Sequence, residues 1–218
     1  TLNILEAIRL INKKIRFYQA STSELFGTNN GKSFNEKSIF KPASPYGVSK
    51  LYSYWITINY RESYGMFCSN GILFNHESPR RGETFVTSKV CKGAVDYLKK
   101  GITLSIGNLY AVRDWGHAKD YVESMWLILN HKVSDDFVIA TGKTQTVKKL
   151  VISAFKILGV KLKWRGKGEK EVAIDIRDGK IAVKIDPKYF RLTEVPYLKG
   201  DPRKAKKLLK WKNKISFE

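Results

Sequence analysis

The sequence contains few cysteines, few acidic residues and no long hydrophobic run. Its 218 residues include 2 Cys, at Cys68 and Cys91. So few thiols in a chain of this length favour a reducing compartment, and we expect a cytoplasmic protein. No apolar run approaches the roughly 20 residues that cross a bilayer, so we expect no membrane association. The first residues, from Thr1, lack the basic and apolar stretches of a signal peptide, and their helix-like pattern suggests a fragment of a longer chain.

Acidic residues are outnumbered two to one. The chain has 40 Lys and Arg against 20 Asp and Glu, a formal net charge of +20. Such an excess attracts polyanions. The Lys residues are nevertheless scattered, and no zinc-ligand cluster or aromatic RNA-binding motif accompanies them. We therefore expect neither nucleic-acid binding nor a metal site, and a phosphorylated small molecule fits the charge better.

The hydrophobic pattern alternates between helix and strand periods. Apolar residues at helical spacing predict a helix over residues 2–12, followed by a buried strand over 15–20 and a loop over 21–27. Residues 46–64 read as a long helix, with Ser44 as N-cap, Pro45 in the first turn and Gly65 at the end. A buried strand over 69–74 and a loop over 75–82 follow. Such alternation predicts the α/β class with parallel strands.

The same alternation continues and then weakens. Helices are predicted over residues 85–99, 117–129 and 147–158, and strands over 103–106 and 137–140. From about residue 160 only short strands are indicated, over 161–164, 172–176 and 182–185, before a short helix over 203–209. Ligands of open parallel sheets gather at the carboxyl ends of strands. The loops 21–27 and 75–82 both follow strands, so they are the candidate ligand-binding loops.

Tyr46 and Lys50 lie four residues apart on the predicted long helix. Side chains at this spacing are neighbours. An ammonium beside a phenol stabilises the phenolate, which lets tyrosine act as an acid or base. The pair alone is weak support, because it also occurs on ordinary solvated helix surfaces.

The loop after the first strand carries Ser21, Thr22, Ser23 and Glu24. Hydroxyls there could bind the same substrate hydroxyl that Tyr46 deprotonates, and a carboxylate could remove a proton next to a newly formed ketone. The alternative is a turn or helix-capping cluster, which suits the same residues. The two motifs together favour a catalytic site.

These motifs occur within longer segments that resemble the GDP-mannose 4,6-dehydratases, a family of extended short-chain dehydrogenases/reductases. The resemblance covers almost the whole chain. Its segments are 17–27 (FYQASTSELFG), 44–50 (SPYGVSK), 70–82 (NGILFNHESPRRG), 113–122 (RDWGHAKDYV), 137–142 (FVIATG), 189–195 (YFRLTEV) and 200–201 (GD).

The resemblance implies a fold and an organisation. We expect the C-terminal part of a Rossmann-like doubly wound parallel sheet, with a small mixed α/β substrate-binding domain. Residues 1–76 would form a partial NAD(P)-binding domain carrying the catalytic residues. Residues 77–218 would hold the rest of the sheet, interleaved with the nucleotide-sugar-binding domain. A homodimer or homotetramer is also implied.

The resemblance further implies a reaction, in which GDP-mannose becomes GDP-4-dehydro-6-deoxymannose on the way to GDP-fucose or GDP-rhamnose. Thr22 and Ser23 would orient the sugar, and Tyr46 with Lys50 would deprotonate the C4 hydroxyl while hydride passes to NADP. Glu24 would remove the C5 proton before water leaves C6, and the hydride would return there. The residues implied in cofactor binding are Tyr46, Lys50, His76 and Arg81. Those implied in GDP-sugar binding are Asn75, Lys89, Arg113, Arg191 and Glu194. We interpret His117 as a helix N-terminal residue.

One family feature is missing from the sequence. The chain has no strand followed by GxGxxG, the turn that seats a dinucleotide pyrophosphate. A truncated chain, a second polypeptide supplying this part, and a non-catalytic remnant are the three explanations. Another nucleotide-sugar epimerase or dehydratase is the competing function, against which Glu24 favours the dehydratase.

Overall fold

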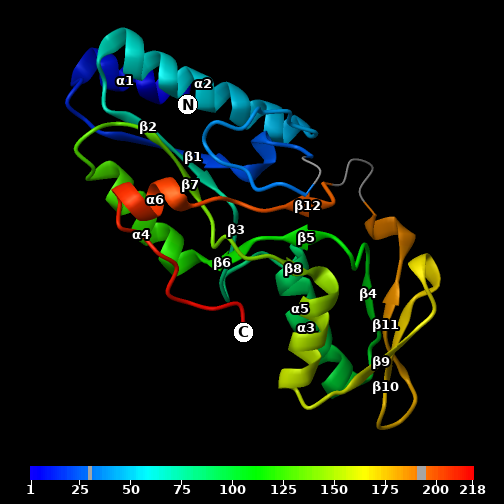
Figure 1. Ribbon diagram of the computed structural model, residues 1–218. Coiled ribbons are helices and arrows are strands. Elements are labelled where there is room, and N and C mark those ends of the chain that lie inside the picture. The colour runs from blue at the N-terminus through cyan, green and yellow to red at the C-terminus, as the bar shows by residue number, and fades with distance from the viewer. Residues whose placement is uncertain (29–30, 191–194) are drawn as a thin grey trace. The chain divides into compact units, whose positions relative to one another are not determined.

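The computed structural model of the chain describes residues 1–28, 31–190 and 195–218. They divide into two compact units. Unit 1 is drawn from residues 1–78, 114–144 and 197–217, and unit 2 from residues 79–113 and 145–196 together with Glu218. The chain therefore passes between the two units several times. Figure 1 labels the elements of both.

Unit 1 is built on a three-stranded parallel sheet in the order β1–β2–β7. Its strands are β1 (Phe17–Thr22), β2 (Cys68–Leu73) and β7 (Asp136–Ile139). Every residue of the central strand β2 is buried, as in sheets that are covered on both faces. The parallel α/β class predicted from the sequence is confirmed. The first strand begins and ends two residues later than predicted. Ser21 and Thr22 therefore belong to β1 rather than to the loop.

Helices cover both faces of this sheet. Helices α2 and α4 both contact β1 and β2 from opposite faces (Figure 1). Helix α1 packs on α2, and α6 packs on β7. Their bounds are α1 Leu2–Ile11, α2 Pro45–Tyr64, α4 Ala118–Leu129 and α6 Arg203–Leu208. A pair of short parallel strands, β3 (Asn75–Glu77) and β6 (Trp115–His117), completes the unit with β12 (Tyr197–Leu198). The prediction of an uninterrupted loop over residues 75–82 is therefore wrong at β3.

The ends of α2 follow the expected signals. The Ser44 hydroxyl accepts the Gly47 N–H at 3.0 Å, which caps the helix, and Pro45 occupies its first turn. Gly65 ends it in the left-handed region at φ 64°, where a side chain would be strained. The helix that carries Tyr46 and Lys50 is thus fixed at both ends by local sequence.

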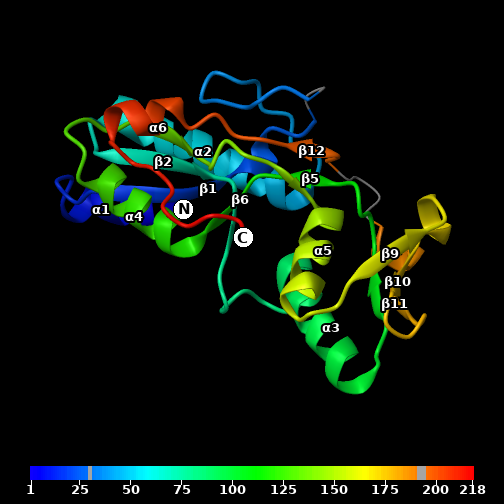
Figure 2. The ribbon, with the colours of Figure 1, turned by 60° about the horizontal axis from the view of Figure 1, so that its bottom comes forward.

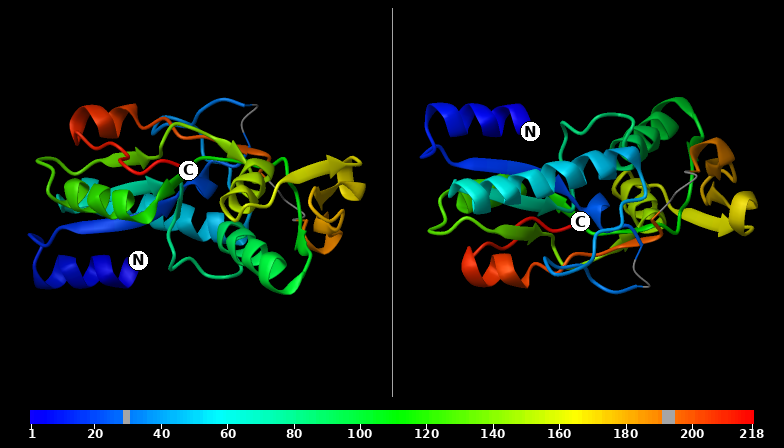
Figure 3. Two further views of the ribbon diagram at one scale, coloured as in Figure 1. Left: turned by 90° about the horizontal axis from the view of Figure 1, so that it is seen from below. Right: turned by 90° about the horizontal axis from the view of Figure 1, so that it is seen from above.

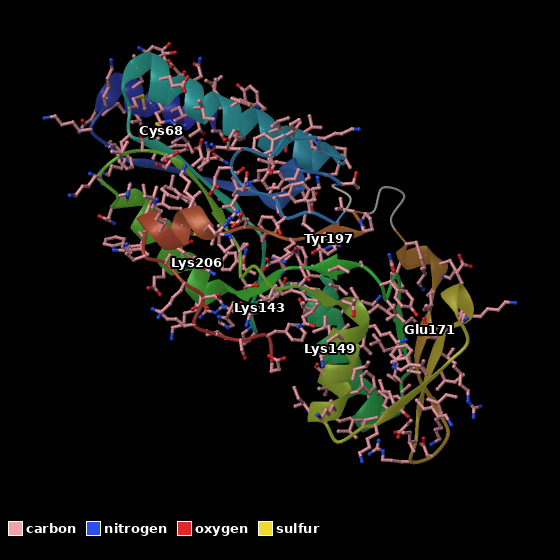
Figure 4. The ribbon with its side chains drawn as sticks, viewed as in Figure 1. Cys68, Lys143, Lys149, Glu171, Tyr197 and Lys206 are labelled. Atoms are coloured by element: carbon pink, nitrogen blue, oxygen red, sulfur yellow. The ribbon has the colours of Figure 1, made fainter. Side chains whose placement is uncertain are left out.

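A hydrophobic cluster joins α1 to the end of α2 and the start of β2. It consists of Leu5, Ile8, Tyr60, Met66 and Cys68. Cys68 is fully buried at the beginning of β2 (Figure 4), and burial raises the pKa of its thiol to about 11. Cys68 is therefore a core residue.

Unit 2 is a mixed α/β unit. Its sheet has the order β4–β11–β10–β9, in which β4 and β11 are parallel and β10 is antiparallel to both of its neighbours. Helices α3 and α5 pack on each other beside this sheet (Figure 2). The elements are α3 Val86–Lys100, β4 Leu104–Ile106, α5 Val147–Ile157, β9 Leu162–Arg165, β10 Val172–Asp175 and β11 Ile181–Ile185, with the short antiparallel pair β5 Val112–Arg113 and β8 Gln145–Thr146. Three 3₁₀ turns, η1 in unit 1 and η2 and η3 in unit 2, cover Ser23–Leu25, Gly168–Lys170 and Pro187–Tyr189.

Candidate active site

The two predicted ligand-binding loops lie at one edge of the unit 1 sheet. Strands β1 and β2 are parallel and in register, with Thr22 opposite Leu73. The turn η1, which carries Ser23 and Glu24, therefore begins beside the point where Asn75 follows β2. This is the carboxyl edge of a parallel sheet, where ligands bind in such folds.

The hydroxyl residues of this edge are held close to the backbone. The Thr22 hydroxyl accepts the Glu24 N–H at 3.3 Å and so caps η1. Ser23 is buried. The Ser21 hydroxyl is also buried and has no hydrogen-bond partner among the described residues. A buried hydroxyl without a partner is costly, which makes Ser21 a place where a ligand atom would be favourable.

Glu24 is tied to the start of α2. The Ser44 hydroxyl donates to the Glu24 carboxylate at 2.9 Å while it accepts the Gly47 N–H at 3.0 Å. A Cβ on Gly47 would lie 2.9 Å from the Pro42 Cβ and 3.0 Å from the backbone oxygen of Glu24, so the close approach of helix and loop favours glycine there. From the sequence, Ser44 is expected only to cap the helix; its hydrogen bond to Glu24 follows no local pattern, because the partner is twenty residues away.

Tyr46 and Lys50 are neighbours, as their spacing predicts. The Lys50 Nζ lies 5.8 Å from the centroid of the Tyr46 ring. Lys50 also donates to the backbone oxygen of Ala20 at 2.9 Å, near the end of β1. The Tyr46 side chain is half exposed. The helix therefore brings the ammonium to the strand that leads into Ser23 and Glu24, and leaves the phenol open to solvent.

Asn75 and His76 follow β2 on the same edge. The Asn75 side-chain oxygen is buried without a hydrogen-bond partner among the described residues. The His76 Nδ1 lies 2.8 Å from the Phe74 carbonyl, and its ring stacks on Tyr121 with 4.8 Å between centroids. His76 is thus fixed in orientation, whereas Asn75 holds an unused acceptor.

The remaining predicted binding residues belong to unit 2 or lie outside the described residues. The Arg81 guanidinium lies 3.6 Å from the centroid of the Phe85 ring, and the Lys89 ammonium lies 3.0 Å from that of Tyr189. Arg113 donates to the Val112 carbonyl at 2.9 Å. Arg191 and Glu194 lie outside the described residues.

His117 caps a helix. Its Nδ1 accepts the Lys119 N–H at 3.1 Å at the start of α4. This agrees with its interpretation as a helix N-terminal residue. None of the helices in the described ranges is long and apolar enough to cross a membrane.

The fold is shared with enzymes that act on nucleotide sugars. A dTDP-glucose 4,6-dehydratase from Bacillus anthracis, solved with NAD, superposes with a TM-score of 0.81 at 21% identity over all of this chain and 62% of its own. A UDP-glucose 4-epimerase from Thermus thermophilus, also solved with NAD, gives a TM-score of 0.74 at 22% identity over 99% of this chain and 64% of its own. Both dehydratases and epimerases share this Rossmann-type fold, so the fold alone does not separate them.

The sequence separates them. The profile of the family described as GDP-mannose 4,6 dehydratase matches residues 1–218, and the chain belongs to this family. It is 52% identical to the GDP-mannose 4,6 dehydratase of Dictyostelium discoideum over 99% of this chain and 62% of that protein. It is 50% identical to that of Homo sapiens over 100% of this chain and 59% of that protein. The chain thus spans about three fifths of the length of the curated relatives it matches.

Proposed function

We propose that this chain supplies the catalytic part of a GDP-mannose 4,6-dehydratase, a lyase that converts GDP-α-D-mannose into GDP-4-dehydro-6-deoxy-D-mannose. The observation that carries the proposal is the carboxylate of Glu24, tied through Ser44 to the helix that bears Tyr46 and Lys50. An epimerase of this kind removes a hydride from one carbon and a proton from the hydroxyl on that carbon, and then returns both. It needs no such carboxylate. A dehydratase must also remove a proton beside a ketone.

The first half of the reaction rests on the hydroxyls and the Tyr46–Lys50 pair. Thr22 and Ser23 bind and orient the C4 hydroxyl of the sugar. Tyr46, as the phenolate, takes the proton of that hydroxyl, and the nearby Lys50 ammonium stabilises this phenolate. When bound, a nicotinamide cofactor, NADP by family resemblance, supplies the hydride acceptor and donor.

The second half rests on Glu24. The 4-ketone acidifies the proton at C5, which Glu24 removes, and water then leaves from C6. The Ser44 hydroxyl holds the carboxylate at the edge of the sheet, so the base does not have to be ordered during the reaction. Hydride then adds at C6 while a proton returns to C5, and because the hydride came from C4, the reaction has no net oxidation.

The residues at the strand ends fit a bound nucleotide and cofactor. The side-chain oxygens of Ser21 and Asn75, which have no hydrogen-bond partner in the described part of the chain, would gain hydrogen bonds from a ligand at the carboxyl edge. We assign Tyr46, Lys50, His76 and Arg81 to the cofactor. We assign Asn75, Lys89, Arg113, Arg191 and Glu194 to the GDP-sugar, since cations and amides recognise phosphate and base edges.

We also propose a cytoplasmic homodimer or homotetramer. Both cysteines are thiols, as in a reducing compartment. The exposed side of α2 carries Val48, Tyr52 and Trp55, and such apolar surface is typical of subunit contacts. Sedimentation velocity of the purified chain tests this: a monomer at all concentrations would contradict it.

A chimera tests the activity. Residues 1–218 replace the matching part of the Dictyostelium relative, and the purified protein is incubated with GDP-mannose, with and without added NADP. We expect the 4-keto-6-deoxy product, seen by NMR. A chimera that is folded by circular dichroism and binds NADP but forms no product would contradict the proposal and favour a non-catalytic role. Formation of an epimerised GDP-hexose would favour the epimerase.

A further inference from the structure

Lys89 is a cation at an unfavourable place in a helix. Its backbone N–H donates to the Phe85 carbonyl at 2.9 Å, which closes the first turn of α3. That turn contains no acidic residue, and the N-cap residue Phe85 offers no side-chain hydrogen bond. The positive end of a helix dipole disfavours a cation in this position. Lys89 therefore does not stabilise the helix that carries it.

The Lys89 ammonium is held by an aromatic ring. Its Nζ lies 3.0 Å from the centroid of the Tyr189 ring, and Tyr189 is 43% exposed. A cation over the face of such a ring is attracted by the ring quadrupole. Among the described residues no carboxylate pairs with this ammonium. The ring therefore restricts the lysine side chain and leaves its charge uncompensated within that part of the chain.

A neighbouring lysine of the same helix is held in a different way. Lys92 lies one turn further along α3 and pairs with the Glu83 carboxylate at 2.8 Å. A carboxylate orders a lysine and compensates its charge, whereas an aromatic ring orders the lysine only. Lys89 is thus prepared to meet an anionic ligand, and Lys92 is not.

The turn η3 fixes the ring of Tyr189. The Asp186 N–H donates to the Ile106 carbonyl of β4 at 2.9 Å, and the Asp186 carbonyl accepts the Tyr189 N–H at 3.0 Å. The Lys188 ammonium lies 5.0 Å from the centroid of the same ring, but it pairs with the Asp186 carboxylate at 3.1 Å. Of the two ammonium groups near the ring, the one of Lys188 is therefore compensated.

A glycine allows the turn to lie close to β4. A Cβ on Gly107, the residue after β4, would lie 2.5 Å from the Tyr189 carbonyl oxygen. In both views of Figure 3, β4 (green) runs beside β11 (orange), and η3 follows β11. Any larger residue at Gly107 would push the backbone of Tyr189 away from β4. The position of the ring is thus set by the sheet of unit 2.

We propose that Tyr189 is a positioning residue whose ring holds the Lys89 ammonium in place for the GDP part of the substrate. A lysine that is ordered before the ligand arrives avoids the cost of restricting its flexible side chain on binding. Its N–H groups then donate charge-assisted hydrogen bonds to acceptor oxygens of the nucleotide. This role rests on the proposed assignment of Lys89 to the GDP-sugar, and it affects affinity rather than the chemical step.

Titration calorimetry of the chimera with GDP tests the role of the ring. Tyr189→Leu removes the aromatic face and is expected to weaken GDP binding about fivefold to tenfold. Tyr189→Phe keeps the face and is expected to bind within about twofold of the wild type. Tyr110→Leu is the control, because Tyr110 is a similarly exposed tyrosine of unit 2 whose ring lies 5.5 Å from the Lys148 ammonium. Unchanged affinity in Tyr189→Leu, or no rescue by Tyr189→Phe, would overturn the proposal.

A double variant shows whether the ring acts through the lysine. Lys89→Met is expected to weaken GDP binding about tenfold or more, the range for a lost hydrogen bond from a charged group. Adding Tyr189→Leu is expected to cause no further loss, because the ring then has no ammonium to hold. Additive losses would show that the ring contacts the nucleotide itself, and would overturn the positioning role. Lys92→Met is the control and is expected to bind GDP normally.

Kinetics of the chimera separate this role from the proposed function. Tyr189→Leu is expected to raise KM for GDP-mannose in proportion to the loss of GDP affinity and to keep kcat, because binding is lost equally in the ground and transition states. A lower kcat with unchanged KM would overturn the proposal. A wild-type chimera that binds GDP through Lys89 and Tyr189 but forms no product would leave the positioning role intact and count against the dehydratase. Absence of GDP binding by the wild-type chimera would overturn both.

Discussion

The Ser44 hydroxyl joins the Glu24 carboxylate, 2.9 Å away, to the first turn of α2. The same hydroxyl accepts the Gly47 N–H and so completes the helix cap. One side chain thereby fixes both the proposed base and the helix that presents Tyr46 and Lys50. The sheet edge and the helix end are coupled through a single oxygen atom.

Replacing Ser44 tests this coupling. Ser44→Ala removes the cap and the donor to Glu24, and is expected to lower the free energy of unfolding by about 1 kcal/mol, as for other lost N-caps. In the chimera it is expected to lower kcat up to about 100-fold, because a displaced base is poorly oriented. Urea unfolding and product NMR measure the two effects. Ser44→Thr keeps the hydroxyl and is expected to restore most of both, and its failure to do so would contradict the coupling.

Tyr46 and Lys50 are expected to affect the chemical step. Tyr46→Phe and Lys50→Met in the chimera are expected to lower kcat by about 10²–10⁴, the range for a lost acid–base group. The thermal unfolding midpoint is expected to change little, because Tyr46 is half exposed. Tyr52→Phe, on the same helix and similarly exposed, is the control and keeps full activity. A Tyr46→Phe enzyme with normal kcat would refute the assignment.

The ion pair between Arg61 and Asp136 is expected to stabilise unit 1. Arg61 donates twice to the carboxylate, at 2.9 and 3.0 Å, and both side chains are nearly buried. Arg61→Met leaves Asp136 as a buried charge without its cation and is expected to cost about 3–5 kcal/mol in urea unfolding. Lys214→Met removes a solvent-exposed pair with Glu123 in the same unit and is expected to change the midpoint little. Similar effects of both variants would contradict the role of burial.

Glu171 makes the folding stability of unit 2 depend on pH. Burial raises the pKa of its carboxyl, but hydrogen bonds from Lys148 at 2.5 Å and Tyr110 at 2.6 Å outweigh this and leave the pKa below 4.5. Because the folded pKa lies below the unfolded one, the stabilisation is present above pH 4.5 and is lost as the pH falls through the folded pKa.

Urea unfolding between pH 3 and pH 7 measures this stabilisation, because that range extends to both sides of the ordinary glutamate pKa of 4.5. Glu171→Gln is expected to flatten the acid side of the stability profile. The exposed neighbour Glu169→Gln is the control and is expected to retain the wild-type slope. An unchanged acid slope in Glu171→Gln would contradict the assignment.

The sequence predicted local features better than distant ones. The bounds of α2, its Ser44 cap and the Tyr46–Lys50 spacing follow from neighbours in the chain, and the structure agrees. The hydrogen bond between Ser44 and Glu24 and the one from the Val138 N–H of β7 to the Glu36 carboxylate both join residues far apart in sequence. No local pattern predicts either of them. The short strands β3, β5, β6, β8 and β12 were missed because so short a run has no recognisable period, whereas β4 was predicted within residues 103–106. The assignment of Arg191 and Glu194 to the GDP-sugar stays a prediction.

The fate of the C5 hydrogen tests the central claim most directly. The chimera converts GDP-mannose in D₂O, and NMR follows the product at C5. The account predicts that the wild-type chimera gives product carrying solvent deuterium at C5, and that Glu24→Gln, with the same unfolding midpoint, loses both product and exchange. Normal formation of the C5-deuterated product by Glu24→Gln would contradict the claim that this chain provides the base of a GDP-mannose 4,6-dehydratase.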